Sequence, residues 1–344
     1  MDGPQAIDEE RTIYDRYHRP IVCLRISVTS ECSLRCFYCH KENQEPQKRQ
    51  LTIEEIGLIC RAASGIGIRK VKITGGEPLL RHDIDKVVLA ISSTPGIKEV
   101  SMTTNGILMA PRAASLVGAG LKRANISLPS INPQTYQKVT GTANYDERLG
   151  ILNKVLSGID AAVAAGLSPV KINMVVLRGL NHHEIPKMIE FVKERRAILQ
   201  LIELQNLGID RDLYNRYHDN LQSTEEWLTE RASKIETRHH SQNRKRYTIS
   251  GTEVEVVRPM DNESFCAACT KIRVSADGEI RPCLMRTDNS VRIPTEALAT
   301  RSEEAIRQLF EEAIKRREPF FVSSKMKPHP MRGDNHVTIP GASK

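Results

Sequence analysis

Three cysteines that could bind a metal centre lie within eight residues near the start of the chain: Cys32, Cys36 and Cys39. Their C-x3-C-x2-C spacing on one short loop lets three thiolates converge on one centre. A structural zinc site needs four ligands, and the only nearby fourth candidate is His40, directly beside Cys39, so the spacing favours an iron–sulfur cluster with one open iron. The alternative is buried thiols or a disulfide framework, which we disfavour because we expect no secretory signal and disulfides are rare in reducing compartments.

A second group of three cysteines occurs late in the chain, with C-x2-C-x13-C spacing. Its members are Cys266, Cys269 and Cys283. A zinc knuckle would need a fourth ligand, and the available His329 and His336 have no useful spacing, so we favour a second cluster with an open iron. Three cations lie in the same segment: Lys271, Arg273 and Arg281. An open iron can bind a purine nitrogen or oxygen, while cations of this kind can bind phosphates.

The composition suits one large domain, or a domain with an extension: 344 residues, 40% hydrophobic and 27% charged. The net charge of +8 favours an anionic partner. Because aromatic residues make up only 4%, we expect a phosphorylated small molecule and no nucleic acid. No apolar run approaches the ~20 residues of a membrane span, so we expect no membrane association and a cytoplasmic location. The remaining Cys23 and Cys60 lie in apolar segments and are expected in the core.

Strand and helix patterns alternate about six times through the first 200 residues. We expect strands at 21–28, 70–74, 99–104, 123–128, 170–177 and 199–204, and helices at 51–63, 83–91, 109–119, 134–138, 151–165 and 184–194. This alternation predicts a parallel α/β fold, and six units are too few for a closed eightfold barrel. Chemistry in such folds occurs at the carboxyl ends of the strands, where this sequence carries the first cysteine loop, Gly75-Gly76-Glu77-Pro78, Thr103 and Ser127.

After residue 206 the alternation stops, which suggests a division of the chain. We expect a core at 1–206, a C-terminal region at 207–320 that carries the second cysteine group and covers the barrel mouth, and a mobile polar tail at 321–344. Within the C-terminal region we expect a hairpin at 241–258, turning at Ser250-Gly251, and an amphipathic helix at 300–317.

The first cysteine loop, with Tyr38 before its last cysteine and a Gly-Gly-Glu-Pro turn after the next strand, resembles the signature of the radical S-adenosylmethionine (SAM) superfamily. The resemblance implies a partial (β/α)6 barrel with a C-terminal extension carrying a second iron–sulfur cluster. It implies that the open iron of the first cluster binds SAM, whose reductive cleavage yields a 5′-deoxyadenosyl radical. The residues it places around SAM are Tyr38, Gly75, Gly76, Glu77 and Ser127.

Both cysteine groups together resemble the GTP 3′,8-cyclase family (the MoaA family), which starts molybdenum cofactor biosynthesis. The resemblance runs from about residue 11 to 320 and includes the segments 24–29, 72–81, 125–128, 169–176 and 273–278. It implies two [4Fe-4S] clusters, SAM, and conversion of GTP to (8S)-3′,8-cyclo-7,8-dihydroguanosine 5′-triphosphate, which a cyclic pyranopterin monophosphate synthase then uses. Arg273 would also aid the final reduction step. The GTP-binding residues it implies are Arg25, Lys72, Thr103, Lys171, Lys271, Ile272 and Arg273.

Some residues depart from the family pattern. Lys72 and Lys271 stand where many members have Arg, Gln200 and Gln205 replace an Arg and a Met, and Pro129 replaces an Asp. Lys keeps the charge of Arg but loses its bidentate phosphate geometry. The sequence also ends without the Gly-Gly of many members. Two alternatives stay open: another radical SAM enzyme with an auxiliary cluster, acting on a different nucleotide or a peptide, and a zinc or iron–sulfur protein that binds nucleic acid. A homodimer is possible, and the electron donor is unknown.

Overall fold

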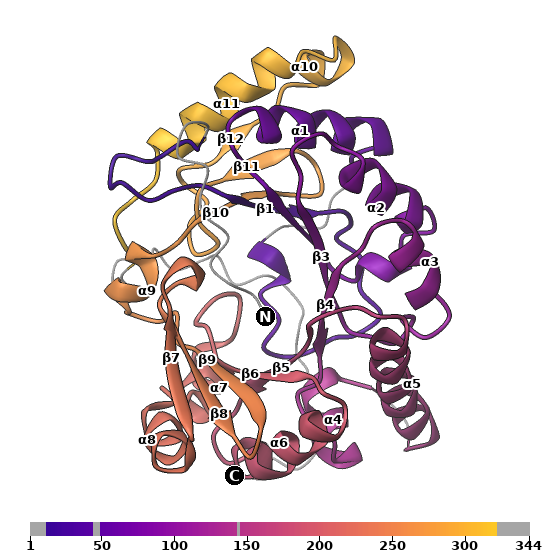
Figure 1. Cartoon of the computed structure of the whole chain (residues 1–344), viewed down its shortest axis with the longest axis vertical. Coiled ribbons are helices and arrows are strands. Elements are labelled where there is room, and N and C mark those ends of the chain that lie inside the picture. The colour runs from indigo at the N-terminus through magenta and orange to yellow at the C-terminus, as the bar shows by residue number, and fades with distance from the viewer. Residues whose placement is uncertain (1–11, 44–48, 143–144, 322–344) are drawn as a thin grey trace.

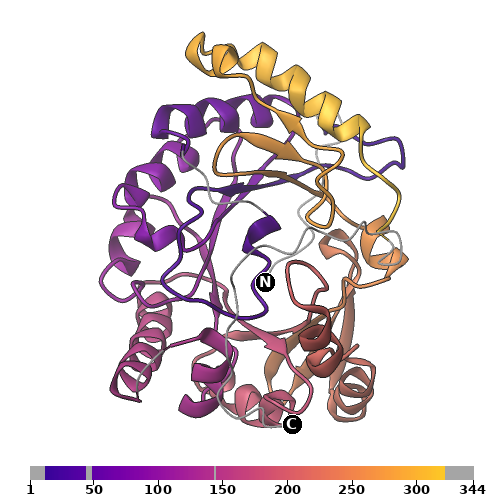
Figure 2. The ribbon, with the colours of Figure 1, turned by 180° about the vertical axis from the view of Figure 1, so that it is seen from behind.

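The computed structural model describes residues 12–43, 49–142 and 145–321, and its strands form one curved sheet. Figures 1 and 2 show the sheet bent into an incomplete ring with helices on its outer side. The strands are β1 (Cys23–Ser27), β2 (Lys70–Thr74), β3 (Glu99–Thr104), β4 (Arg123–Ser127), β5 (Val170–Val176), β6 (Ile198–Glu203), β7 (Lys234–Arg238), β8 (Arg244–Ile249), β9 (Thr252–Val257), β10 (Lys271–Val274), β11 (Glu279–Arg281) and β12 (Val291–Arg292).

The strand order is β12-β11-β10-β1-β2-β3-β4-β5-β6-β9-β8-β7. All neighbours from β10 through β1 to β6 and β9 are parallel, whereas β11, β12, β8 and β7 join antiparallel at the two edges. The parallel α/β fold and the open partial barrel predicted from the sequence are therefore confirmed. Strands β9 and β10 from the late part of the chain lengthen the parallel sheet at both ends, which the strand–helix alternation did not predict.

Among the described residues, six α-helices connect the strands β1 to β6 and cover the outer face of the sheet: α1 (Ile53–Gly65), α2 (Ile84–Ser92), α3 (Ala113–Gly118), α4 (Pro133–Thr140), α5 (Tyr145–Ala164) and α6 (Ile185–Glu194). The helix predicted at 51–63 is present as α1 and begins two residues later, because the Thr52 side chain caps it by accepting from the Glu55 backbone N–H, while the Glu55 carboxylate accepts from the Thr52 N–H. The helix predicted at 109–119 is shorter. It begins only at Ala113, since the chain makes turns through Pro111, which has no backbone N–H to donate.

The core lies between the sheet and these helices. On β1 and β2, Leu24, Ile26, Val71 and Ile73 are fully buried and belong to one cluster that includes residues of α1. Burial of each such side chain contributes ~1.5–3 kcal/mol. Because side chains alternate along a strand, the residues between them face the inside of the ring. The residues at these inward positions include charged and polar ones, so the inner face of the ring suits a polar binding site.

Between β6 and residue 321, where the described chain ends, five further α-helices follow: α7 (Arg211–Tyr217), α8 (Gln222–Arg231), α9 (Glu263–Ala267), α10 (Thr295–Ala299) and α11 (Glu303–Lys315). The predicted hairpin is present as β8–β9, turning at Ser250 and Gly251. The helix predicted at 300–317 is present as α11 and begins three residues later, because Ser302 caps it and its side chain accepts from the Ala305 N–H. The division into 1–206 and 207–320 stays a prediction, and the predicted tail lies outside the described residues except for Phe321. None of the described helices is long and apolar enough to cross a membrane.

Candidate active site

The first cysteine loop follows β1 at the carboxyl end of the parallel strands. Cys32 and Cys39 each accept from a backbone N–H two residues later, at 3.5 and 3.4 Å from Sγ. Burial raises the pKa of all three thiols, and the neighbouring thiols raise those of Cys32 and Cys36 further, so the three sulfurs lie near one another. In the described part of the chain, no three His, Cys, Asp or Glu side chains are placed to hold a single metal ion. Three thiols fit a multi-iron cluster, in which each thiolate binds a different iron.

The Gly-Gly-Glu turn after β2 packs directly on the backbone that leads into the cysteine loop. The Gly76 N–H donates to the Thr29 carbonyl (2.8 Å), and the Glu77 N–H donates to the Glu31 carbonyl (2.7 Å). A Cβ at Gly75 would lie 2.4 Å from Thr29 O, and one at Gly76 would lie 2.0 Å from Glu31 O. Only glycine allows this approach, so the predicted SAM-binding turn and the cysteine loop form one packed unit.

Glu77, predicted to contact SAM, is 1% exposed and is held by donors of its own chain. Its carboxylate accepts from the Leu79 N–H (3.0 Å), the Thr104 hydroxyl (2.6 Å) and the Asn105 N–H (2.6 Å). Burial nevertheless raises its pKa. The Asn105 amide in turn donates to the Ser33 hydroxyl (3.2 Å). Glu77 therefore ties the ends of β2 and β3 together, and Asn105, which the sequence analysis did not single out, links them to the cysteine loop.

The other predicted SAM and substrate residues near this loop lie at strand ends. Ser127 is the last residue of β4 and is half-buried, and Thr103, also half-buried, lies opposite Asn125 of β4. Tyr38 packs edge-on against Phe37, with ring centroids 5.8 Å apart, and burial raises its pKa. All three therefore belong to the same end of the sheet as the first cysteine loop.

The second cysteine group occupies a different environment, beside buried arginines. Arg19 donates to the Cys266 carbonyl (3.1 Å) and Arg317 to the Cys269 carbonyl (2.9 Å). Burial alone would raise the pKa of Cys269, but Arg317 and Lys271 lower it overall. The Met285 N–H donates to Cys283 Sγ (3.4 Å). A small apolar cluster adjoins Cys266 and Cys283, and its buried members are Leu207, Leu284, Met285 and Phe321. Backbone donors, nearby cations and apolar cover suit three cluster thiolates.

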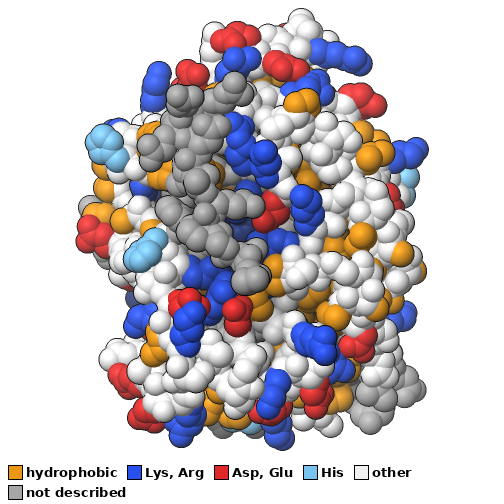
Figure 3. All heavy atoms as spheres, viewed as in Figure 1, with side chains coloured by type: hydrophobic (Ala, Val, Ile, Leu, Met, Phe, Trp, Pro, Cys, Tyr) orange, Lys and Arg blue, Asp and Glu red, His pale blue; other side chains and the backbone are white. Residues whose placement is uncertain are grey.

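The predicted cations lie on the inner face of the ring. Arg25 and Lys72 are opposite each other on β1 and β2, and Lys171 on β5 lies opposite Asn125. Lys72 donates to the Asn125 side chain (3.1 Å). Burial lowers the pKa of both lysines to about 7. Figure 3, which views the whole molecule from the same side as Figure 1, shows Lys and Arg side chains gathered around the centre of that molecular face. Lysines poised near neutrality would become fully charged beside a phosphate.

A carboxylate that the sequence analysis missed joins two of the predicted GTP-binding cations. Glu42 accepts from Arg25 and from Arg273, each at 3.2 Å. Burial would raise its pKa, but the two guanidinium groups outweigh this effect and lower it to about 2. In Figure 1 the short violet helix of residues Lys41–Asn43 lies in the middle of the ring. Lys271, on β10 with Ile272 and Arg273, is held separately by the Gln242 side chain.

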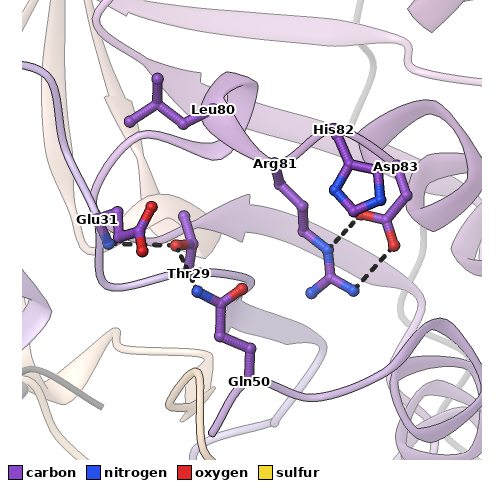
Figure 4. Close-up of a pocket in the computed structure, with 7 residues that line it drawn as sticks. All are labelled: Thr29, Glu31, Gln50, Leu80, Arg81, His82 and Asp83. Carbon is purple, nitrogen blue, oxygen red and sulfur yellow. Dashed lines mark hydrogen bonds and ion pairs between the residues drawn. The ribbon is translucent and has the colours of Figure 1, made fainter. Parts of the chain in front are cut away.

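A pocket of about 180 Å³ lies beside the first loop, but it contains none of the predicted site residues. Figure 4 shows its lining. Gln50 donates to Thr29 (3.1 Å), and Arg81 pairs with Asp83 (2.6 Å). These groups satisfy one another, so we assign no ligand to this pocket.

Comparison with known proteins shows the relationship of this chain. Residues 26–192 match the radical SAM superfamily, and residues 197–322 match the family described as Molybdenum Cofactor Synthesis C. A probable GTP 3′,8-cyclase of Methanothermobacter thermautotrophicus is 44% identical over 90% of this chain and 99% of its own. The probable GTP 3′,8-cyclase of Methanosarcina mazei is 46% identical over 91% of each chain. The chain belongs to the GTP 3′,8-cyclase family.

Solved structures show the same fold at low identity. SuiB of Streptococcus suis bound to S-adenosylmethionine has a TM-score of 0.57 and 17% identity, covering 78% of this chain and 62% of SuiB. The protein anSMEcpe with bound AdoMet has a TM-score of 0.56 and 16% identity, covering 86% and 84%. The predicted family and radical SAM fold are confirmed. The chain is therefore an enzyme of the radical SAM superfamily, which uses SAM and an iron–sulfur cluster.

Proposed function

We propose that this enzyme cyclises GTP to (8S)-3′,8-cyclo-7,8-dihydroguanosine 5′-triphosphate, the first step of molybdenum cofactor biosynthesis. The observation that carries the proposal is the convergence of Arg25 and Arg273 on Glu42. Arg273 follows Cys269 by four residues, and Glu42 follows Cys39 by three. A pair of guanidinium groups already gathered around one anion, between two cysteine groups, suits a phosphorylated substrate. The names of the relatives favour GTP.

The two cysteine groups would hold two [4Fe-4S] clusters. When bound, the first cluster and SAM supply the radical that removes a ribose hydrogen. The chain itself binds and orients. The residues proposed to hold the first cluster are Cys32, Cys36 and Cys39, those for the second are Cys266, Cys269 and Cys283, and those around SAM are Tyr38, Gly75, Gly76, Glu77 and Ser127. Because a radical must meet one hydrogen only, positioning and exclusion of water are the main work of the protein.

The substrate would lie across the inner face of the ring, with its base toward the second cysteine group. The apolar cluster of Leu207, Leu284, Met285 and Phe321 suits the base, and the cations of β1, β2, β5 and β10 suit the phosphates. Lys72 and Lys171, with pKa values of about 7, would gain protons as phosphates bind. Thr103, Ile272 and Lys271 complete the proposed set, and Arg273 would also aid the final reduction.

The reaction needs a partner at each end. A reductant must supply electrons to the first cluster, and a cyclic pyranopterin monophosphate synthase would consume the cyclised nucleotide. We place the enzyme in the cytoplasm, where reducing conditions preserve thiolate-bound clusters, and we propose a homodimer as its assembly.

An anaerobic assay of the cluster-reconstituted enzyme with SAM, dithionite and GTP tests the proposal. Liquid chromatography with mass spectrometry should detect 5′-deoxyadenosine and a nucleotide that has the mass of GTP but a different retention time, as expected for its cyclised isomer. In Cys266→Ala we expect loss of the cyclised product. SAM cleavage with GTP returned unchanged would reject GTP as the substrate and would favour another nucleotide or a peptide, without affecting membership of the superfamily.

A further inference from the structure

One buried carboxylate on β9, Glu255, gathers more cations than it can neutralise. It is fully buried, and it faces the inside of the ring opposite Gln200 of β6, whose amide donates to it (2.6 Å). Four cations lie within ion-pair distance of its oxygens: Arg238 at 2.6 Å, Lys171 at 2.7 Å, Arg246 at 3.3 Å and Arg244 at 3.6 Å. Three of these four come from β7 and β8, strands to which the sequence analysis gave no function.

The cations around Glu255 exceed the carboxylates that pair with them. Arg246 has a second partner in Glu253 (2.9 Å). The nearby Glu236 is 43% exposed and pairs with Lys234 (2.8 Å). Among the described residues, only Glu255 and Glu253 pair directly with these four cations, whose side chains are 3–24% exposed, while Glu236 acts on Arg246 and Arg238 without a direct pair. Keeping surplus like charge in a desolvated place is costly, so this arrangement predicts an anionic ligand that supplies the missing negative charge.

Arg244 is the member of this group with the weakest hold on Glu255. Its contact of 3.6 Å is longer than a hydrogen bond. In the described chain its guanidinium makes one hydrogen bond, from Nε to the Ser241 carbonyl (2.6 Å). Burial lowers its pKa although Glu255 raises it, and Arg244 shares Glu255 with Lys171, one of the proposed GTP-binding cations. Arg244 thus reaches from β8 toward the proposed GTP cations and keeps donors to spare.

We propose that Arg244 is a phosphate-binding residue for the substrate, and that Glu255 fixes its neighbours Lys171 and Arg238 so that Arg244 faces the phosphates. This inference rests on the proposed function. Gln200 of β6, opposite Glu255, is uncharged, whereas β8 carries Arg246 opposite Glu255 and Arg244 two residues before it, so β8 supplies charge on this side of the ring. A triphosphate offers three charged groups to these cations, whereas a monophosphate offers one. Arg244 would therefore make binding depend on the number of phosphates.

Equilibrium dialysis of the reconstituted enzyme, without SAM or reductant, tests this dependence with GTP, GDP, GMP and ATP. For Arg244→Met we expect the GTP Kd to rise roughly tenfold or more, the GDP Kd to rise less and the GMP Kd to stay unchanged, because charge-assisted hydrogen bonds to the distal phosphates are lost. Arg244→Lys should lose only part of the affinity. Arg258→Met is the matched control, since Arg258 follows β9 and pairs with Glu225 of α8 at 2.6 Å, and its Kd values should equal those of the wild type.

Two results would overturn the assignment: an unchanged GTP Kd in Arg244→Met, or an equal loss for GTP, GDP and GMP. Iron content and thermal unfolding of each variant separate loss of the fold from loss of a contact. If the wild type binds ATP as tightly as GTP, and the loss in Arg244→Met still follows phosphate number, the phosphate site stands and the guanine substrate of the proposed function fails.

Discussion

The two cysteine groups are built in different ways. The first is held by backbone: glycines at 75 and 76 let the turn after β2 touch the carbonyls of Thr29 and Glu31. The second is held by side chains: Arg19 and Arg317 reach in from distant parts of the chain to the carbonyls of Cys266 and Cys269. One thiol differs in its electrostatics as well. Burial raises the pKa of all three thiols of the first group and of Cys266 and Cys283, whereas Arg317 and Lys271 lower the pKa of Cys269.

This difference indicates what each region tolerates. The close packing of two backbone segments leaves no room for an added side-chain atom or for water, and it holds the two segments in one fixed geometry. Buried arginines instead combine hydrogen bonds with positive charge, which suits a place where an anionic substrate meets thiolates. We therefore expect the first region to fail through steric change and the second through loss of charge.

The largest effect is expected for Gly76→Ala. The new methyl group would lie 2.0 Å from the Glu31 carbonyl oxygen. To relieve this clash the backbone must move, and the hydrogen bonds that the Gly76 and Glu77 N–H groups donate to the cysteine-loop segment would be lost. We expect SAM cleavage to be abolished and the iron content to fall toward half of the wild-type value, as the first cluster is lost and the second stays. Iron analysis, electron paramagnetic resonance and the 5′-deoxyadenosine assay measure this result.

Gly118→Ala is the control for that variant, because nothing lies within 4 Å of a Cβ at the end of α3. It should keep both clusters and full activity. Equal loss of both clusters in Gly76→Ala would show that the two regions do not behave independently, and the comparison would break down.

An intermediate effect is expected for Arg317→Met. The Arg317 side chain is 3% exposed and pairs with the fully buried Asp15 at 3.1 Å. Removing one partner of a buried pair costs ~3–5 kcal/mol, and we expect the lower end of this range because Arg19 still pairs with Asp15 at 2.7 Å. Denaturant unfolding of the metal-free protein measures this cost, and iron analysis should show that the second cluster is lost while SAM cleavage persists.

The neighbouring Arg316 provides a matched control. Its side chain is 44% exposed and pairs with the half-exposed Glu312, so Arg316→Met should change stability by no more than ~1 kcal/mol. If Arg317→Met kept the second cluster, side-chain cations would not be what holds that region together.

Local signals predicted much of the molecule. The strand and helix patterns and the Ser250-Gly251 turn each lie within a few residues, and the structure contains the first six strands and the hairpin as expected. Strand β7 was missed because its sequence, Lys-Ile-Glu-Thr-Arg, has little hydrophobic alternation. The helix at 109–119 was predicted too long because the apolar periodicity hid the turns around Pro111.

The charged interior could not be predicted in the same way. Glu42 meets Arg273 only because β10 pairs with β1 across some 250 residues, and Glu255 meets Lys171 only because β9 joins β6. Such pairings follow from the tertiary fold, and no local pattern encodes them. The family resemblance singled out the cations, whereas no sequence feature singled out the carboxylates that arrange them.

The smallest effect is expected for Glu42→Gln, which sharpens the comparison because Glu42 links the two regions. Its carboxylate joins Arg25 of β1 to Arg273 of β10 and would compete with substrate phosphates for both. Since its folded pKa is about 2, below the usual value, its ionised form stabilises the fold above pH ~4.5, and this contribution is lost only as the pH falls toward 2. At neutral pH the competitor is thus fully charged. We expect Glu42→Gln to bind GTP roughly three- to tenfold more tightly in equilibrium dialysis, with a smaller gain for GDP.

Glu225→Gln serves as the control, because Glu225 pairs with Arg258 away from the proposed phosphates and its loss should leave the GTP Kd unchanged. Weaker GTP binding by Glu42→Gln would mean that Glu42 holds Arg25 and Arg273 in their working positions, or that it accepts from the guanine itself. The Kd for GMP distinguishes the two cases. If Glu42 organises the arginines, Glu42→Gln should lose more affinity for GTP than for GMP. If Glu42 contacts the guanine, the variant should lose the same affinity for both nucleotides. A gain that grows with phosphate number would leave competition as the remaining explanation, and the first cysteine loop would then also regulate entry to the second region.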